Sequence, residues 1–158
     1  MPRRRISRMT WAVTVGLAGL FALFAWSLLG LHVNEPRGPV SAAEAASVAS
    51  IPIPPEATNI RIAGYSQWIQ YEQYVRFEAP VAVCLRHAAA VVPGEPLTPV
   101  GQDELKSSRL PVRQDVFLDF SWFDLRNASS VAGAGGGPSQ PRVWVDQDRG
   151  VFYYRKTD

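Results

Sequence analysis

The longest apolar stretch of the chain lies near its amino terminus. No Asp, Glu, Lys or Arg occurs between Met9 and Asn34. A helix over residues 11–31 would be about 31 Å long, because an α-helix rises about 1.5 Å per residue, and this length suits the hydrocarbon core of a bilayer. The pattern therefore predicts one transmembrane helix over residues 11–31, through which the chain contacts the lipid bilayer.

The residues around this stretch predict its orientation. Residues 1–10 form a short tail with four arginines, and the positive-inside rule keeps such a tail in the cytoplasm. The protein is thus expected to be a single-pass inner-membrane protein with its main domain outside the cytoplasm. The alternative is a cleaved signal peptide, whose apolar core is about 7–15 residues long with a small-x-small cleavage site soon after. The nearest such site, residues 47–49, lies well beyond the run, which favours an uncleaved anchor.

The pattern changes again after the apolar stretch. Residues 32–55 are rich in Ala, Ser, Pro and Gly without a sustained period, and we predict a flexible tether there. Residues 56–158 are the predicted extracytoplasmic domain. Within them, helical spacing of apolar residues predicts a helix over 80–92. Polar and apolar residues alternate, as in strands, over residues 59–62, 71–78, 115–120, 142–146 and 150–156.

The first two strands and the last two are each expected to pair as hairpins. On 71–78, alternation places Glu72, Tyr74, Arg76 and Glu78 together on a face that we interpret as solvated. A capping pattern predicts a short helix over residues 121–128, a further helical turn is possible at 103–110, and the Gly-rich residues 129–141 are predicted to be a mobile loop. The fold class is therefore α+β, a small and mostly antiparallel sheet of order β-β-α-β-β-β with one main helix packed on it.

Charge and cysteine content narrow the function. From residue 51 onward, eleven Lys and Arg stand against twelve Asp and Glu, so the domain has no basic excess for nucleic acid. No motif for a cofactor occurs, and none is expected. Cys84, the single cysteine, lies three residues before His87, which would suit a thiolate–imidazole pair on a helix. We favour packing for both, because Cys84 falls in the apolar stripe and no third group orients the histidine.

Carboxylates offer the main alternative chemistry. Asp115, Asp119 and Asp124 crowd one strand and the turn after it, and with Asp146 they would suit a metal-dependent or acid–base hydrolase. Asp146 and Asp148 have the spacing that begins a calcium loop, so the possible metal set is Asp115, Asp119, Asp146 and Asp148. We favour a hairpin turn at Asp146 and Asp148, because the strand pattern resumes directly after them.

Several segments of the outer domain carry a family resemblance. They are PPEATNI, YVRFEAPVAVCL, SWFDL and VWVDQDRGVFYYRKTD. Together they resemble uncharacterised small bacterial envelope proteins of planctomycete type. The resemblance implies one amino-terminal span and a compact outer domain, and it implies no activity.

The preferred interpretation is a non-catalytic binding or assembly module of the bacterial cell envelope, which contacts another envelope protein. Alternation in the last hairpin predicts the contact surface: if Val143 and Val145 face the core, Trp144 points away from it. An exposed tryptophan would then mark a recognition surface around Trp144, Tyr153 and Arg155. The competing possibilities are that Trp144 faces the core or that the Gly-rich loop covers it.

Overall fold

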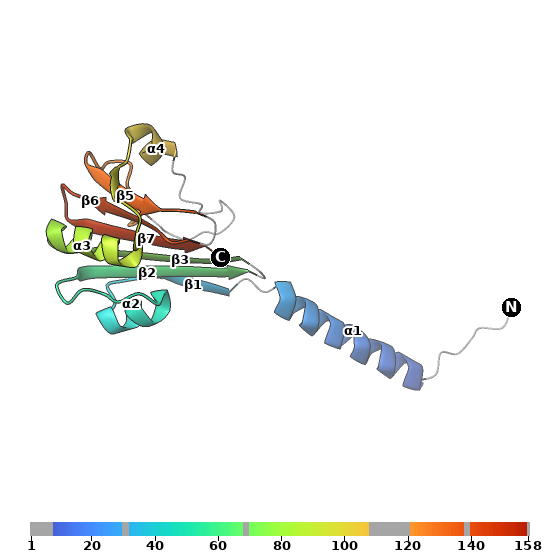
Figure 1. Ribbon diagram of the computed structural model, residues 1–158. Helices are drawn as coiled ribbons and strands as arrows, with labels where there is room; N and C mark the ends of the chain where they lie inside the picture. Colours follow the sequence, from blue (N-terminus) through green and yellow to red (C-terminus); the bar gives the residue numbers. More distant parts are fainter. Residues whose placement is uncertain (1–7, 30–31, 68–69, 108–120, 138–139, 158) are drawn as a thin grey trace.

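The computed structural model in Figure 1 describes residues 8–29, 32–67, 70–107, 121–137 and 140–157. Its helices are α1 (Arg8–Leu29), α2 (Ala42–Ala49), α3 (Val81–Val91) and α4 (Gln102–Ser107). Its strands are β1 (His32–Arg37), β2 (Thr58–Gln67), β3 (Gln70–Glu78), β4 (Thr98–Pro99), β5 (Val131–Gly135), β6 (Arg142–Asp146) and β7 (Val151–Thr157).

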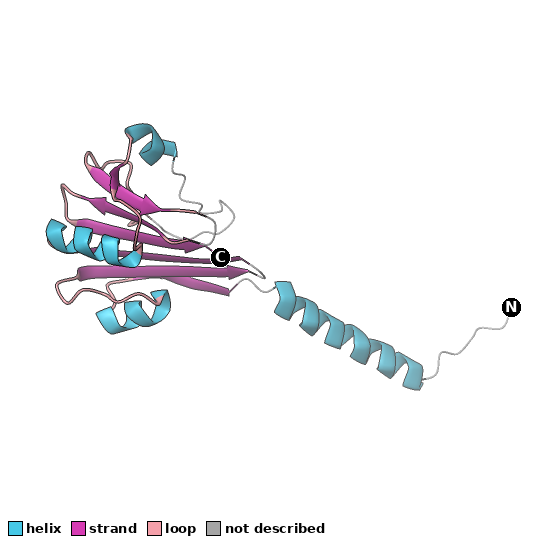
Figure 2. Cartoon of the chain, in the orientation of Figure 1, coloured by secondary structure: helices cyan, strands magenta, loops and turns pink. Residues whose placement is uncertain are grey.

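All strands join one antiparallel sheet with the order β1-β2-β3-β7-β6-β5-β4. Figure 2 shows this sheet in magenta with the helices around it. The α+β class is confirmed, and so are both predicted hairpins, because β2 pairs with β3 and β6 pairs with β7. The predicted strand 115–120 lies outside the described residues.

One face of the sheet is covered by α2 and α3. The helix predicted over 80–92 is confirmed as α3, which begins directly after Pro80, a residue whose missing N–H costs little at a helix start. At α2, the Ser41 hydroxyl accepts a hydrogen bond from the backbone N–H of Glu44 at 3.2 Å and caps the helix. The side chains buried between these helices and the sheet include Ala45, Ala49, Ile60, Ile62, Val75, Phe77, Cys84, Ala88, Val143, Val145, Phe152 and Tyr154.

The opposite face is also largely covered, which corrects the expectation of a solvated face. Residues 121–128 form turns and not the predicted helix. The Asp124 carboxylate accepts from the backbone N–H of Arg126 at 2.9 Å, a local bond that competes with helix formation. Phe123 then enters the core and packs its ring edge-on against Tyr74 and Tyr153, at centroid distances of 5.4 and 5.1 Å.

Two segments predicted to be irregular contain regular structure. The tether prediction for residues 32–55 is wrong in this respect, because β1 pairs with β2 and α2 buries Ala45 and Ala49 in the core. The loop prediction for residues 129–141 is wrong over β5. Gly133 lies opposite Trp144 on β6, and a Cβ at Gly133 would stand 2.8 Å from the Val100 side chain and 3.2 Å from the indole ring. The glycine thus makes room for a large neighbour.

α1 spans 22 residues, and Figure 1 shows it extending away from the sheet. Nearly all of its described side chains are exposed, with 66% of Trp11 and 73% of Phe21 accessible. In the part of the chain whose side chains are described, no helix is both long and apolar enough to cross a membrane.

Candidate functional site

The surface predicted around Trp144, Tyr153 and Arg155 is not an exposed aromatic patch. Trp144 is only 4% exposed and Tyr153 only 1%. Alternation does place Trp144 on the face opposite Val143 and Val145, as expected. The expectation of exposure is wrong because Phe123 contacts the indole ring edge-on, at a centroid distance of 6.2 Å, and residues 121–128 form a second cover.

Arg155 is half-buried and lies 3.7 Å from Glu72, guanidinium nitrogen to carboxylate oxygen. Its neighbour across the hairpin, Arg142, places its guanidinium over the ring of Trp144 at 5.2 Å from the centroid. Both arginines therefore help to close the edge of the covered face, and the hydroxyl of Tyr74 donates to Glu72 beside them. Burial and this hydrogen bond raise the pKa of Tyr74.

The candidate carboxylates serve the local fold. The buried Asp146 side chain accepts from the backbone N–H groups of Asp148 at 3.0 Å and Arg149 at 3.1 Å, which confirms the turn interpretation. Asp148 in turn accepts from the backbone N–H of Ser130 at 3.0 Å. No group of three His, Cys, Asp or Glu side chains suited to a metal ion occurs among the described residues. Asp115 and Asp119 lie outside these residues.

Cys84 and His87 are both buried on α3 and belong to the core. The Cys84 thiol donates to the backbone carbonyl of Ala79 at 3.5 Å, and burial raises the pKa of the thiol to about 11. The His87 ring packs edge-on against Phe77 and Phe152, and burial lowers its pKa. A raised thiol pKa opposes thiolate formation, so the packing interpretation fits the structure and the nucleophile interpretation does not.

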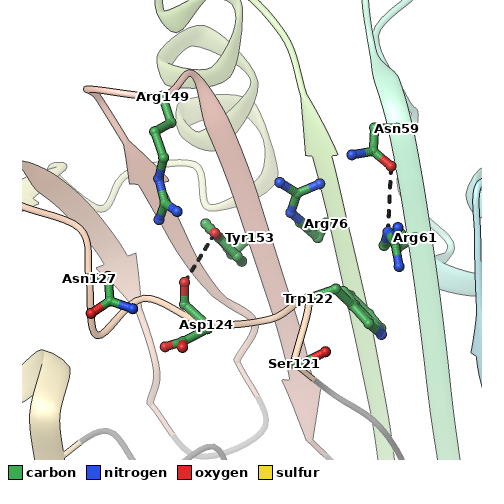
Figure 3. A pocket seen from close by; sticks show the side chains of 9 residues that line it. All are labelled: Asn59, Arg61, Arg76, Ser121, Trp122, Asp124, Asn127, Arg149 and Tyr153. Atoms are coloured by element: carbon green, nitrogen blue, oxygen red, sulfur yellow. Dashed lines mark hydrogen bonds between the residues drawn. The ribbon is translucent and has the colours of Figure 1, made fainter.

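A polar pocket opens on the second face of the sheet, at the edge of the cover formed by residues 121–128. Its volume is about 420 Å³. Figure 3 shows its lining residues: Asn59, Arg61, Arg76, Ser121, Trp122, Asp124, Asn127, Arg149 and Tyr153. Three arginines and one aspartate supply the charges of this lining, and no histidine or cysteine takes part.

Strand pairing places the floor of this pocket. Arg61 on β2 lies directly opposite Arg76 on β3, and Arg76 lies directly opposite Tyr153 on β7. In Figure 3, Arg149 reaches in from the β6–β7 turn, while Asp124 and Trp122 belong to the covering segment. The pocket therefore combines side chains from three adjacent strands, one turn and the cover.

The polar atoms of the pocket have defined partners. The Tyr153 hydroxyl donates to the backbone carbonyl of Asp124 at 3.3 Å, which ties the cover to β7. Burial raises the pKa of Tyr153, and the charges of Arg149 and Arg76 partly oppose this. Two hydrogen bonds of 2.9 Å from the Arg126 guanidinium hold the pKa of the Asp124 carboxyl below its usual value, although burial works in the other direction.

The charges of two arginines are balanced nearby. Arg76 donates to Glu78 at 2.6 Å, and Arg149 donates to Asp146. Burial of Glu78 is outweighed by its hydrogen bonds from Arg76 and Asn59, so its pKa is lowered. The arrangement suits binding of a ligand with hydrogen-bond acceptors, because guanidinium groups only donate.

No protein-family model, curated protein or solved structure matches this chain. The site must therefore be interpreted from its own chemistry.

The sequence interpretation missed Arg61, Arg76 and Arg149 as site residues, whereas Tyr153, predicted for a recognition surface, lies in the pocket lining. Arg61 and Arg76 each lie on a strand that alternation predicts, but alternation alone does not say which residues lie opposite one another. Arg149 lies in the predicted hairpin turn, where the sequence pattern indicates a change of chain direction but no binding role. The sequence pattern carried no signal for this juxtaposition, because it depends on the hairpin register. In the structure Gln67 pairs with Gln70, and this register brings Arg61 opposite Arg76.

Proposed function

We propose that this protein is a non-catalytic binding module of the bacterial cell envelope, anchored in the inner membrane with its sheet domain outside the cytoplasm. The observation that carries the binding function is the arginine-lined pocket of about 420 Å³ beside residues 121–128. It gathers side chains from distant parts of the chain on a sheet face that is otherwise covered.

The proposed anchor rests on the sequence over residues 11–31. This stretch lacks charged residues, and the four arginines before it favour a cytoplasmic amino terminus. The helical conformation of α1 over Arg8–Leu29 is consistent with this, since a helix satisfies its own backbone hydrogen bonds in lipid. Exposed apolar side chains such as Phe21 would contact acyl chains and not water.

The described carboxylates support binding over hydrolysis. Asp146 is occupied by two backbone N–H groups and by Arg149, Asp148 holds Ser130, and Asp124 is held by Arg126. A general acid or base needs a carboxylate free to reach a substrate proton. The pocket instead presents positive side chains around a hollow, which suits recognition.

Topology is tested with reporters fused after Asp158. We expect alkaline phosphatase fused there to be active and a fluorescent reporter that matures only in the cytoplasm to stay dark. The reverse result would refute the outward orientation.

Binding is tested by placing a photo-crosslinking residue at Asn127, which is exposed and lines the pocket. The matched control places it at Ala90, which is exposed on α3 on the other side of the sheet. In native membranes we expect a discrete adduct from position 127 and none from position 90. Equal adducts from both positions, or none from 127, would contradict a binding role for the pocket.

A further inference from the structure

We infer that the pocket binds a compact oxyanion, a phosphate or carboxylate group, through Arg61, Arg76 and Arg149. The inference rests on the proposed binding function and specifies the chemistry of its ligand. It follows from the register of the sheet, from the balance of charges around the pocket and from the burial of its floor.

The register sets two like charges side by side. Arg61 and Arg76 are direct cross-strand partners on β2 and β3, and both line the pocket. Like charges directly opposite one another destabilise a strand pair. An anion bound between the two guanidiniums removes this repulsion, whereas a neutral ligand leaves it in place.

The neighbouring carboxylates do not neutralise the whole set. Glu78 pairs with Arg76, and Asp146 pairs with Arg149. Asp124 is held by Arg126, which is not part of the lining. The hydrogen bond assigned to Arg61 goes to the neutral amide oxygen of Asn59 at 3.4 Å, and among the described residues no ion pair involves Arg61. Among the described residues, one guanidinium of the pocket, that of Arg61, therefore has no carboxylate paired with it.

A hydrogen-bond donor on the pocket floor also has no acceptor among the described residues. The Nε atom of Arg76 is buried and has no hydrogen-bond partner among the described residues, and the Arg76 side chain is only 13% exposed. A buried donor without a partner costs free energy, which an acceptor would recover. Forked guanidinium donors match the paired oxygens of carboxylate and phosphate groups, and the partial burial strengthens such charge-assisted bonds.

The test is calorimetric titration of the full chain in a neutral detergent. Inorganic phosphate and acetate are the two probes, and sodium chloride holds the ionic strength constant. The variants are Arg61→Gln in the pocket and Arg86→Gln as the matched control, because Arg86 is exposed on α3 and removes the same charge. We expect saturable binding that Arg61→Gln weakens at least about tenfold, the effect of losing a charged hydrogen bond, while Arg86→Gln retains it.

The two probes distinguish the sources of the anion. Tighter binding of phosphate would assign a phosphoryl group, and tighter binding of acetate would assign a carboxyl group. If Arg61→Gln lowers the melting temperature, Arg61→Lys provides the second test: it keeps the charge but loses the fork, and we expect an intermediate affinity.

Absence of saturable binding of both anions, or equal weakening by Arg61→Gln and Arg86→Gln, would overturn the inference. A specific crosslink from position 127 without saturable anion binding would leave the binding module standing with a ligand other than a compact oxyanion. The same crosslink with equal weakening by both variants would leave it standing with the anion bound outside the pocket. Loss of the crosslink as well would refute the proposed function itself.

Discussion

Truncation of Trp144 tests whether the second face of the sheet is a core. The indole is 4% exposed, contacts Phe123 edge-on at 6.2 Å and lies beneath the guanidinium of Arg142. Trp144→Ala would remove all of these contacts and leave a cavity, because the surrounding structure relaxes only partially around a truncated core residue. Such truncations cost about 3–5 kcal/mol, against a typical total stability of about 5–15 kcal/mol. For a domain of this size, the melting temperature should fall by about 10–20 °C.

The assay is thermal unfolding of the full chain in a neutral detergent, followed by far-ultraviolet circular dichroism. Trp11→Ala is the matched control, because Trp11 is 66% exposed on α1 and its loss should leave the sheet unfolding at the wild-type temperature. Trp144→Phe should cost less than Trp144→Ala, since it keeps an aromatic ring against Phe123 and removes an Nε1 donor without a partner among the described residues. Wild-type melting of Trp144→Ala would refute the second core and restore an exposed recognition tryptophan.

Three further predictions concern other parts of the domain. Gly150→Ala should destabilise the protein by more than about 1 kcal/mol in denaturant titrations, because φ of Gly150 is +65° and the added Cβ would lie 2.5 Å from the backbone carbonyl oxygen of Ala79. Gly101→Ala is the control and should not destabilise the protein in this way, because there is open space around Gly101. Cys84 should react with Ellman's reagent at pH 8 only after unfolding, since it is buried with a pKa raised to about 11; rapid reaction of the native protein would contradict this. Arg126 lowers the pKa of Asp124, so the Asp124 carboxylate stabilises the fold above about pH 4, and this contribution is lost as the pH falls through the lowered pKa. Asp124→Asn should therefore lose less stability than the wild type between about pH 4 and pH 2 in denaturant titrations.

Local patterns predicted the elements whose signals are strong and short-range. α3 follows a proline at its start, and its apolar spacing repeats over several turns. β6 and β7 alternate on either side of an Asp- and Gly-containing turn, which the Asp146 side chain holds through backbone hydrogen bonds. In these elements the local preference and the tertiary structure agree, so the sequence pattern is sufficient to predict the type and the approximate bounds of each element.

The same reasoning failed where tertiary packing overrides composition. Ala and Ser in residues 42–49 suggested a tether, yet small side chains let α2 approach the sheet closely enough to bury Ala45 and Ala49. Glycines in residues 131–135 suggested a loop, yet Gly133 makes space for Trp144 across the strand pair. Both segments are short of large apolar residues because their partners supply the bulk, and single-segment periodicity does not detect a partner.

The candidate pocket depends on a property that no single segment carries, the register between two strands. Each step away from the pair Gln67–Gln70 moves one residue along each strand in opposite directions, so Arg61 meets Arg76 six steps later. The register shifts between Thr58 and Arg61, and the pairing beyond it brings Thr58 opposite Glu78. Without that shift, Glu78 would lie opposite Asn59. A loop longer or shorter by one residue would break the arginine pair and move each side chain of β2 to the other face relative to β3. Alternation assigns a side chain to one face of the sheet, whereas the loop between two strands determines which residue lies opposite it. The candidate pocket depends on this second property, because it places Arg61 opposite Arg76.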